Sequence, residues 1–393
     1  MSRPRVLALV DYYLPGYKSG GPLRTIANMV ARLGDRLGFY VLTRDRDATD
    51  AAPYAGVRVG AWNEVAGAQV FYAPPGGLSA RAIRARVAEV APDTIYLNSF
   101  FSPMTVRLLA LRRLGLLPPA PVVIAPRGEL SPGALSLKAP KKRAYLAAAR
   151  AARLYGGLTW QASSDDEAAE IRRELGPAAV RVAPDIPAPL GGEPPAAPPK
   201  APGRLRLVFL SRIAEKKNLH FLLELLPLLR AESVELDVYG PVREPAYWER
   251  CRGLMAGLPA QVVARHRGPV EHEAVGAALA GAHVFALPTL GENFGHAILE
   301  ALAAGRPALV SDRTPWRGLA ERGAGWDLPL EHGPWLAALQ ALVEMGQAEY
   351  EGWSRGARRH AAAFVAAPAL VEANLALFLQ PQRAYEAAPP VHP

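Results

Sequence analysis

Residues 205–219 read Leu-Arg-Leu-Val-Phe-Leu-Ser-Arg-Ile-Ala-Glu-Lys-Lys-Asn-Leu, and this stretch decides the fold of the second half of the chain. The largely apolar run Leu205–Ser211 predicts a strand buried on both faces, and Leu219–Leu229 predicts the helix that follows it. A buried strand that leads through a short polar turn into a helix is the first half of a βαβ unit. The stretch therefore predicts a parallel sheet covered by helices.

The same alternation of short apolar runs and longer helical patterns extends in both directions. Towards the C-terminus we expect strands at Val234–Tyr239, His283–Pro288 and Pro307–Ser311, and helices at Glu271–Ala280 and Gly295–Ala304. Towards the N-terminus we expect strands at Arg5–Val10, Phe39–Thr43, Thr94–Leu97, Val122–Ala125 and Leu158–Gln161, and helices at Pro22–Leu33, Ser79–Val90, Pro103–Leu114 and Asp165–Leu175. The pattern predicts two α/β domains with parallel sheets.

A proline-rich stretch separates the two patterns. Residues 184–203 contain eight prolines and two adjacent glycines, which predicts a stiff, extended linker. The predicted organisation is an N-terminal Rossmann-like domain (1–186), a linker (187–203), a C-terminal Rossmann-like domain (204–367), and a C-terminal helix with a flexible tail (368–393). Ligands of such sheets bind beyond the carboxyl ends of the strands.

Composition excludes several kinds of site. Cys251 is the only cysteine, so an intrachain disulfide and a cysteine-based metal site are excluded, and it is either a reactive thiol or, as we favour, a packing residue. The eight histidines show no metal-binding spacing, so we expect no metal. No stretch approaches the ~18 apolar residues of a membrane-spanning helix, and the first apolar run is too short for a signal peptide. We therefore expect a cytoplasmic location.

The net charge of +9 is compatible with nucleic acid, membrane or an anionic substrate as partner. Five of the seven lysines fall in two clusters, Lys138/Lys141/Lys142 and Lys216/Lys217. No nucleic-acid-binding motif accompanies them, so we expect no nucleic acid partner, although a basic nucleic-acid-binding module is kept as an alternative function from a different class.

The stretch from Leu287 to Gly305 contains the clearest candidate ligand site. A strand ends at Pro288, a turn with Gly291 follows, and a helix begins near Gly295, so the positive end of that helix is suited to bind phosphate. Glu292 lies in the turn, and Glu300 lies in an otherwise apolar helix. A carboxylate there either binds a ligand or points to solvent from one edge of the helix.

Two further turns follow predicted strands. Arg212 and Lys217 are five residues apart across a strand-to-helix turn and are able to converge on one anion, the alternative being a solvated basic turn. In the first half, Gly20 and Gly21 precede a helix and allow the backbone to approach a ligand closely. Neither a GxGxxG fingerprint nor a P-loop is present.

Taken together, these motifs resemble the donor site of family-4-type retaining glycosyltransferases. The resemblance rests on the Glu292/Glu300 pair in Gly-Glu-Asn-Phe-Gly-His, on the Arg212…Lys217 turn, and on Gly20-Gly21. It extends over most of the chain and includes 160–167 and 311–316, while 43–47 and 126–130 are similar to members that build bacterial surface polysaccharides. The resemblance implies an α/β GT-B fold, in which two Rossmann-like domains face each other across a cleft.

The resemblance also implies roles for individual residues. Arg212 and Lys217 would hold the donor diphosphate, Glu292 would contact the transferred sugar, and Glu300 would bind the nucleotide ribose. The backbone at Asn293, Phe294 and Gly295, with Gly20 and Gly21 from the other domain, would complete the cradle, and the nucleobase would lie near Arg267–Val270. Such enzymes need no metal and no cofactor beyond the nucleotide sugar, which is a co-substrate.

The implied function is transfer of a sugar, with retention, from a nucleotide-sugar donor to a glycan or lipid-linked acceptor in cell-surface polysaccharide biosynthesis. A phosphorylase or nucleotide-sugar epimerase of the same fold is the nearest alternative. One departure concerns the first domain, where many relatives carry a histidine facing the sugar. Here the position is Arg127, which cannot act as a general base but is able to bind a substrate oxygen.

Two other segments carry expectations. Asp45 and Asp47 are expected in a solvated loop rather than in a metal site. The stretch 135–154 combines Lys138, Lys141, Lys142 and several arginines with leucines and a tyrosine. It predicts reversible docking on an anionic membrane surface, and the alternatives are a solvated helix face or direct binding of a phosphate on the acceptor.

Overall fold

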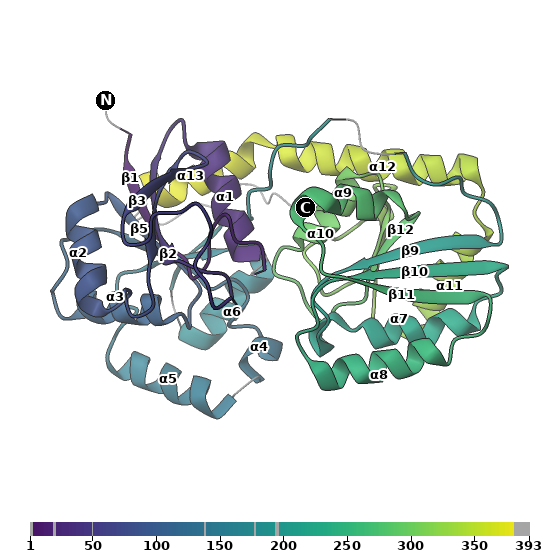
Figure 1. Ribbon diagram of the computed structural model, residues 1–393, viewed down its shortest axis with the longest axis horizontal. Coiled ribbons are helices and arrows are strands. Elements are labelled where there is room, and N and C mark those ends of the chain that lie inside the picture. Colours follow the sequence, from purple (N-terminus) through teal and green to yellow (C-terminus); the bar gives the residue numbers. More distant parts are fainter. Residues whose placement is uncertain are drawn as a thin grey trace. The chain divides into compact units, whose positions relative to one another are not determined.

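The computed structural model describes residues 3–18, 21–48, 50–136, 139–176, 178–192 and 196–380. The chain divides into two units: the first comprises Met1–Pro189 and the C-terminal segment from Ala367, and the second comprises Leu190–Ala366. Each unit contains its own sheet with helices on it (Figure 1). The predicted α/β class with two Rossmann-like domains is therefore confirmed.

Over the described residues the first sheet has eight strands in the order β3-β4-β2-β1-β5-β6-β7-β8, all parallel except the edge strand β3. Their bounds are β1 Arg5–Leu9, β2 Gly38–Arg44, β3 Trp62–Val65, β4 Ala68–Ala73, β5 Thr94–Asn98, β6 Val122–Ala125, β7 Thr159–Ala162 and β8 Ala179–Val182. The helices of this unit are α1 Gly21–Leu33, α2 Ala80–Val90, α3 Pro103–Arg113, α4 Pro132–Ser136, α5 Ala139–Ala151, α6 Asp165–Leu175 and α13 Pro368–Leu379.

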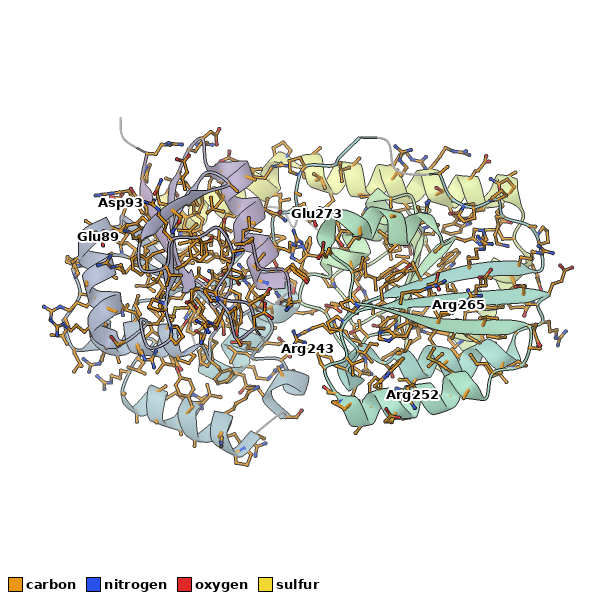
Figure 2. All side chains as sticks on the ribbon, in the orientation of Figure 1. Glu89, Asp93, Arg243, Arg252, Arg265 and Glu273 are labelled. Carbon is orange, nitrogen blue, oxygen red and sulfur yellow. The ribbon has the colours of Figure 1, made fainter. Side chains whose placement is uncertain are left out.

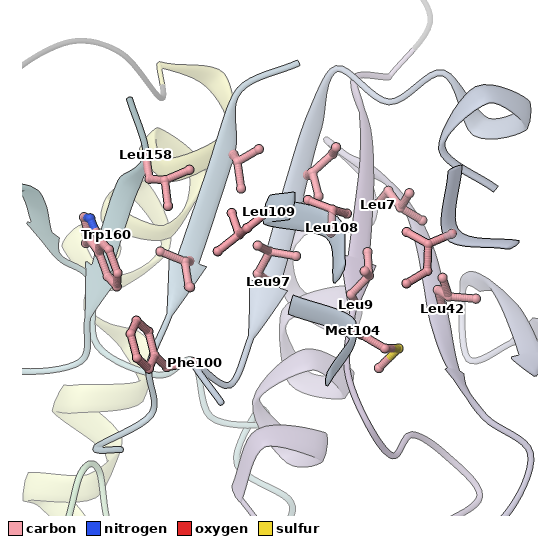
Figure 3. Close-up of a cluster of buried hydrophobic side chains, with 14 of the residues drawn as sticks. Leu7, Leu9, Leu42, Leu97, Phe100, Met104, Leu108, Leu109, Leu158 and Trp160 are labelled. Atoms are coloured by element: carbon pink, nitrogen blue, oxygen red, sulfur yellow. The ribbon is translucent and has the colours of Figure 1, made fainter. Parts of the chain in front are cut away.

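Alternation along β5 shows how both faces of this sheet are covered. Ile95 and Leu97 point into a cluster that includes Met104 and Leu108 of α3 (Figure 3). Tyr96 points the opposite way, and its ring meets that of Phe378 in α13 edge-on at 5.2 Å. The C-terminal helix, which the sequence indicated only as a separate element, therefore belongs to the core of the first unit.

The second sheet, in the part of the chain that the structure describes, has six parallel strands in the order β11-β10-β9-β12-β13-β14. Their bounds are β9 Arg204–Leu210, β10 Ser233–Tyr239, β11 Val262–Gly268, β12 Val284–Leu287, β13 Ala308–Ser311 and β14 Gly325–Leu328. Figure 1 shows α9 (His272–Ala280), α10 (His296–Ala303) and α12 (Gln347–Ala366) on one face, and α7 (Leu219–Leu225), α8 (Pro245–Ala256) and α11 (His332–Glu344) on the other. Cys251 of α8 is fully buried, and burial raises the pKa of its thiol, as expected for a packing residue.

The connection between the units has neither helix nor strand over its described residues, 183–192 and 196–203. Its end is anchored on the second unit by Lys200, which is 3 % exposed. The Lys200 ammonium donates to the carbonyls of Ala201, Val343 and Met345 at 3.0, 3.3 and 2.8 Å. Desolvation lowers the pKa of Lys200 to about 8, because three carbonyl dipoles compensate a buried charge only in part.

The chain returns to the first unit through α12 and α13. Contrary to the expectation from the sequence, the stretch Gln347–Leu379 is long and apolar enough to span a membrane by length and composition. Several of its large apolar residues lie in the two cores, however. Phe364 of α12 packs on Trp316 in the second unit, and Phe378 of α13 packs on Phe39 in the first.

Candidate functional site

Three loops of the second unit meet where β9, β12 and β13 end. The amide of Leu290, after β12, donates to the Lys216 carbonyl, after β9, at 2.8 Å. The amide of Glu292 donates to the Arg313 carbonyl, after β13, at 3.1 Å. These strands are neighbours in a parallel sheet, so their carboxyl ends lie at one edge and their loops brace one another. This edge is where such a sheet binds its ligand.

Lys217 and Glu292, two of the three predicted catalytic residues, form an ion pair at this edge. The Lys217 ammonium donates to Glu292 Oε1, and the two side chains are only 11 % and 13 % exposed. Water screens such a pair less than one on the open surface, so it fixes both side chains. Two ammonium protons and one carboxylate oxygen have no partner among the described residues, which leaves both groups able to bind a ligand.

Arg212, the third predicted catalytic residue, is exposed and lies in the loop that follows β9, directly after Ser211. Within the described parts of the chain its guanidinium has no hydrogen bond or ion pair, so it is positioned by its backbone alone. That backbone is well held, because the amide of Ile213 donates to Pro241 at 2.9 Å and the amide of Arg243 donates to Ile213 at 3.0 Å. Convergence of Arg212 and Lys217 on one anion remains a prediction.

Gly240 allows the loop after β10 to lie close to the loop after β9 at Ser211. This glycine was not singled out from the sequence. A Cβ on Gly240 would lie 1.9 Å from the Ser211 carbonyl oxygen, and its φ of 139° disfavours any side chain. The loop after β10 also presents Arg243, an exposed second arginine beside the Arg212 loop (Figure 2). The available signal was a glycine directly after the predicted strand Val234–Tyr239.

The turn after β12 leads into α10 through Gly295, which has a φ of 83° and provides no side-chain cap. The positive end of α10 therefore lies directly after this turn. The Phe294 ring is buried against Trp316 and Phe364, and its carbonyl accepts from Trp316 Nε1 at 2.6 Å. The side chain of Phe294 thus anchors the turn. Only the backbone of this residue is therefore positioned to contact a ligand. Asn293 beside it is half-buried.

Glu300 lies in the second turn of α10 and is half-buried. The helix buries Ile298, Leu299, Ala301 and Leu302, so Glu300 lies at the border of the apolar face rather than within it. Binding of a ribose by Glu300 remains a prediction. Among the described residues, no three His, Cys, Asp or Glu side chains form a group that could hold a metal ion.

In the first unit, Gly21 is the first residue of α1, whereas Gly20 lies outside the described residues. The expectation that Asp45 and Asp47 lie in a solvated loop is wrong, because both are 3 % exposed. Asp47 is buried because it caps the backbone of the chain that leads to Gly21, a contact between segments that the sequence pattern does not reveal.

Arg127 forms a buried ion pair with Asp185 at the carboxyl edge of the first sheet. Its guanidinium also donates to the Tyr96 hydroxyl at 2.5 Å and to Asn98 at 3.0 Å, and Asp185 accepts from Thr25 of α1 at 2.9 Å. The side chains of Arg127 and Asp185 are 6 % and 5 % exposed. The charge predicted to bind substrate is therefore directed into its own unit.

Sequence reasoning missed Asp185 because it lies among prolines and was included in the proline-rich stretch. A buried arginine requires a carboxylate partner, but the burial of Arg127 is visible only in the tertiary structure. Arg127 Nε and Asn98 Nδ2 are both buried without an acceptor among the described residues.

The second unit also matches a known family. Residues 204–344 match the model described as "Glycosyl transferases group 1". They form a group 1 glycosyltransferase domain. The match contains Arg212, Lys217, Glu292 and Glu300, so the predicted donor-side residues lie inside the family's domain.

Two curated relatives, each named phosphatidyl-myo-inositol mannosyltransferase, match part of the chain. The one from Mycobacterium leprae is 32% identical over 143 residues, which are 35% of this chain and 36% of the relative. The one from Mycolicibacterium smegmatis is 33% identical over 137 residues, 34% of each chain. The chain thus spans about a third of the length of the curated relatives that it matches.

Solved structures resemble the chain over nearly its whole length. The match with sucrose-phosphate synthase from Thermosynechococcus elongatus covers 96% of this chain and 99% of that protein, at 17% identity and a TM-score of 0.73. The match with Anabaena Alr3699/HepE, solved in complex with UDP and glucose, covers 95% of this chain and 98% of that protein, at 16% identity and a TM-score of 0.65. At such identities the likeness concerns the fold, and that fold is GT-B.

Proposed function

We propose that the protein is a retaining glycosyltransferase of the EC 2.4 class, which moves a sugar from a nucleotide-sugar donor to a glycan or lipid-linked acceptor. The observation that carries the proposal is the Lys217–Glu292 pair at the carboxyl edge of a group 1 glycosyltransferase domain. Its ammonium supplies charge for a diphosphate, and its carboxylate supplies an acceptor for sugar hydroxyls. Cell-surface polysaccharide biosynthesis is the proposed setting.

In the proposed reaction the bond between the sugar's anomeric carbon and the donor phosphate oxygen breaks, and the acceptor oxygen bonds to the same face of that carbon. The acceptor's proton passes to the departing diphosphate. Lys217 and Arg212 stabilise the negative charge that develops on the leaving group, which is often the largest catalytic contribution. Glu292 orients the sugar, Glu300 binds the ribose, and the backbone at 293–295 and at Gly21 contacts phosphate and sugar. We propose that no metal or further cofactor takes part.

A donor panel tests this function. UDP-glucose is the first candidate, because Alr3699/HepE has been solved with UDP and glucose. Binding of the right donor to the folded state should raise the melting temperature. Turnover should release the nucleoside diphosphate, persist in EDTA and give a product of retained anomeric configuration. An inverted product, or restoration of an EDTA-sensitive activity by Mg²⁺, contradicts the proposal.

We further propose that the protein is cytoplasmic and docks reversibly on the inner face of the cell membrane. The support is α5, where Lys141, Arg143 and Arg150 are exposed, while Lys138 lies outside the described residues. The apolar partners expected beside them are turned inward: Leu146 is buried, and Tyr145 packs on Phe100. Attraction is therefore electrostatic, about 1 kcal/mol for each basic residue near the surface.

Co-sedimentation with liposomes tests the membrane proposal. Lys142 is an unsuitable choice for charge reversal, because it donates to the Ala134 carbonyl at 2.5 Å and lies over the Phe101 ring. Replacing Lys141, Arg143 and Arg150 by Glu should abolish binding to anionic vesicles and leave transfer to a soluble acceptor unchanged. Salt should weaken the wild-type binding. Failure of the wild type to bind anionic vesicles at low salt overturns the membrane proposal alone.

A further inference from the structure

The chain that follows β1 and leads to the glycine pair is hydrogen-bonded to another segment of the first unit. Its backbone is held by the segment after β2. Asp47 Oδ2 accepts from the amide of Tyr17 at 2.7 Å and from the amide of Lys18 at 2.9 Å. Asp47 Oδ1 accepts from the amide of Ala48 at 2.8 Å. Hydrogen bonds to an ionised acceptor are about twice as strong as neutral ones, and Asp47 is 3 % exposed.

Steric contacts restrict the same segment from other sides. A Cβ on Gly16 would lie 2.4 Å from the Tyr54 hydroxyl, 2.9 Å from the Tyr13 carbonyl and 3.0 Å from Asp47 Oδ2. The Tyr72 hydroxyl donates to the Leu14 carbonyl at 2.5 Å. Residues 14–18 therefore follow a path set by side chains that come from outside the segment.

Both described flanks of the glycine pair are anchored. On one side Lys18 is held by Asp47. On the other side, the Thr25 hydroxyl shares its single proton between the Gly21 carbonyl at 3.1 Å and Asp185 at 2.9 Å. Gly21 is the third residue after Lys18, so a fixed Lys18 confines Gly21 to within about 11 Å of it.

We infer that Asp47 is a positioning residue that fixes the backbone at Tyr17 and Lys18 in the loop that leads to Gly21. The inference rests on the proposed function, in which this loop contacts the donor's phosphate or sugar. Asp47 touches neither donor nor acceptor in this proposal and acts only through the backbone of 17–18. A misplacement of about 1 Å near the reacting atoms is enough to cost ~10²-fold in rate.

Asp50 provides a matched control. It pairs with Lys18 at 2.5 Å in the same loop contact, but its side chain is 40% exposed and the Lys18 side chain is 34% exposed. Exposed ion pairs contribute little to stability. Asp47→Asn keeps the shape of the side chain while it removes the charge and one acceptor. Asp50→Asn makes the same change at an exposed position of the same loop contact.

Hydrogen exchange measured by mass spectrometry reports directly on the loop. Kinetic measurements report on the effect of the loop on sugar transfer. In Asp47→Asn the amides of the peptide that covers Tyr17 and Lys18 should exchange at least ten-fold faster than in the wild type or in Asp50→Asn. With the best donor of the panel, kcat should fall at least ten-fold. Affinity for the corresponding nucleoside, which lacks the phosphates, should stay within about two-fold, because the proposed site assigns the ribose and base to the second unit.

Gly16→Ala displaces the same segment while it retains the Asp47 carboxylate, which the new Cβ approaches to 3.0 Å, and should reproduce the kinetic change if Asp47→Asn folds poorly. Unchanged exchange in Asp47→Asn overturns the inference, whether or not the wild type transfers sugar. Faster exchange with wild-type kcat overturns it too, and so does an equal loss of kcat and of nucleoside affinity. Absence of transfer by the wild type with every donor rejects the proposed function, and the exchange measurement still decides whether Asp47 holds the loop.

Discussion

Lys217–Glu292 in the second unit and Arg127–Asp185 in the first are both ion pairs behind the carboxyl ends of parallel strands, yet their surroundings differ. Three acceptors, Asp185, Tyr96 and Asn98, surround the Arg127 guanidinium. Lys217 has one described side-chain partner, Glu292. An ion pair with spare protons and a spare carboxylate oxygen is able to accept a ligand, whereas one surrounded by its own unit supports structure.

The comparison would fail if Arg127–Asp185 were dispensable for folding. Asp185→Asn should lower the free energy of unfolding by about 3–5 kcal/mol, because it leaves a buried guanidinium without its counter-charge. Urea denaturation measures this loss. The double variant Arg127→Met/Asp185→Leu should lose less than the sum of the two single variants. Additive losses would show that the two side chains are not coupled.

The opposite result is expected for the other pair. Lys217→Ala should reduce kcat by ~10²-fold, as removal of one fixed donor to a developing charge does elsewhere. Its melting temperature should stay within about 2 °C of the wild type. Lys141→Ala, assayed with a soluble acceptor, is the control for loss of a lysine. Near-normal turnover in a folded Lys217→Ala protein contradicts the assignment of the donor site.

Gly240 sharpens the comparison, because it positions Arg212 through the backbone rather than through an ion pair. In Gly240→Ala the new Cβ conflicts with the Ser211 carbonyl, and we expect about 1–3 kcal/mol of lost stability together with reduced turnover. Gly276→Ala is the matched control. It lies inside α9 with no atom within 4 Å of an added Cβ, and should stabilise the protein by up to about 1 kcal/mol.

Lys200 is a third buried cation, and it has carbonyls instead of a carboxylate. Its folded pKa of about 8 lies below the ordinary value near 10.4, so between these values the unfolded state binds more protons and stability rises with pH. Relative to Lys200→Met, the wild type should therefore gain about 1–2 kcal/mol from pH 8 to pH 10 in urea denaturation. An unchanged difference would mean that burial does not depress this pKa.

Sequence patterns were sufficient for elements whose signal is local. Each strand predicted in 205–311 exists within one or two residues of its expected bounds, because an apolar run between turns is buried on both faces. β11 and β14 escaped prediction, as did β3, β4 and β8. β11 reads Val-Val-Ala-Arg-His-Arg-Gly, and an edge strand with polar side chains has no such apolar run.

The candidate site divides in the same way. The sequence by itself determined the α/β class, the two domains and the residue types that follow β9 and β12, since each of these depends on neighbours along the chain. Only the tertiary structure decided that Lys217 pairs with Glu292, 75 residues away, that Arg127 turns inward to Asp185, and that Asp47 is buried under the loop of Tyr17. Partners of charged groups depend on which loops share a sheet edge, and strand order, which a linear pattern does not encode, sets that edge.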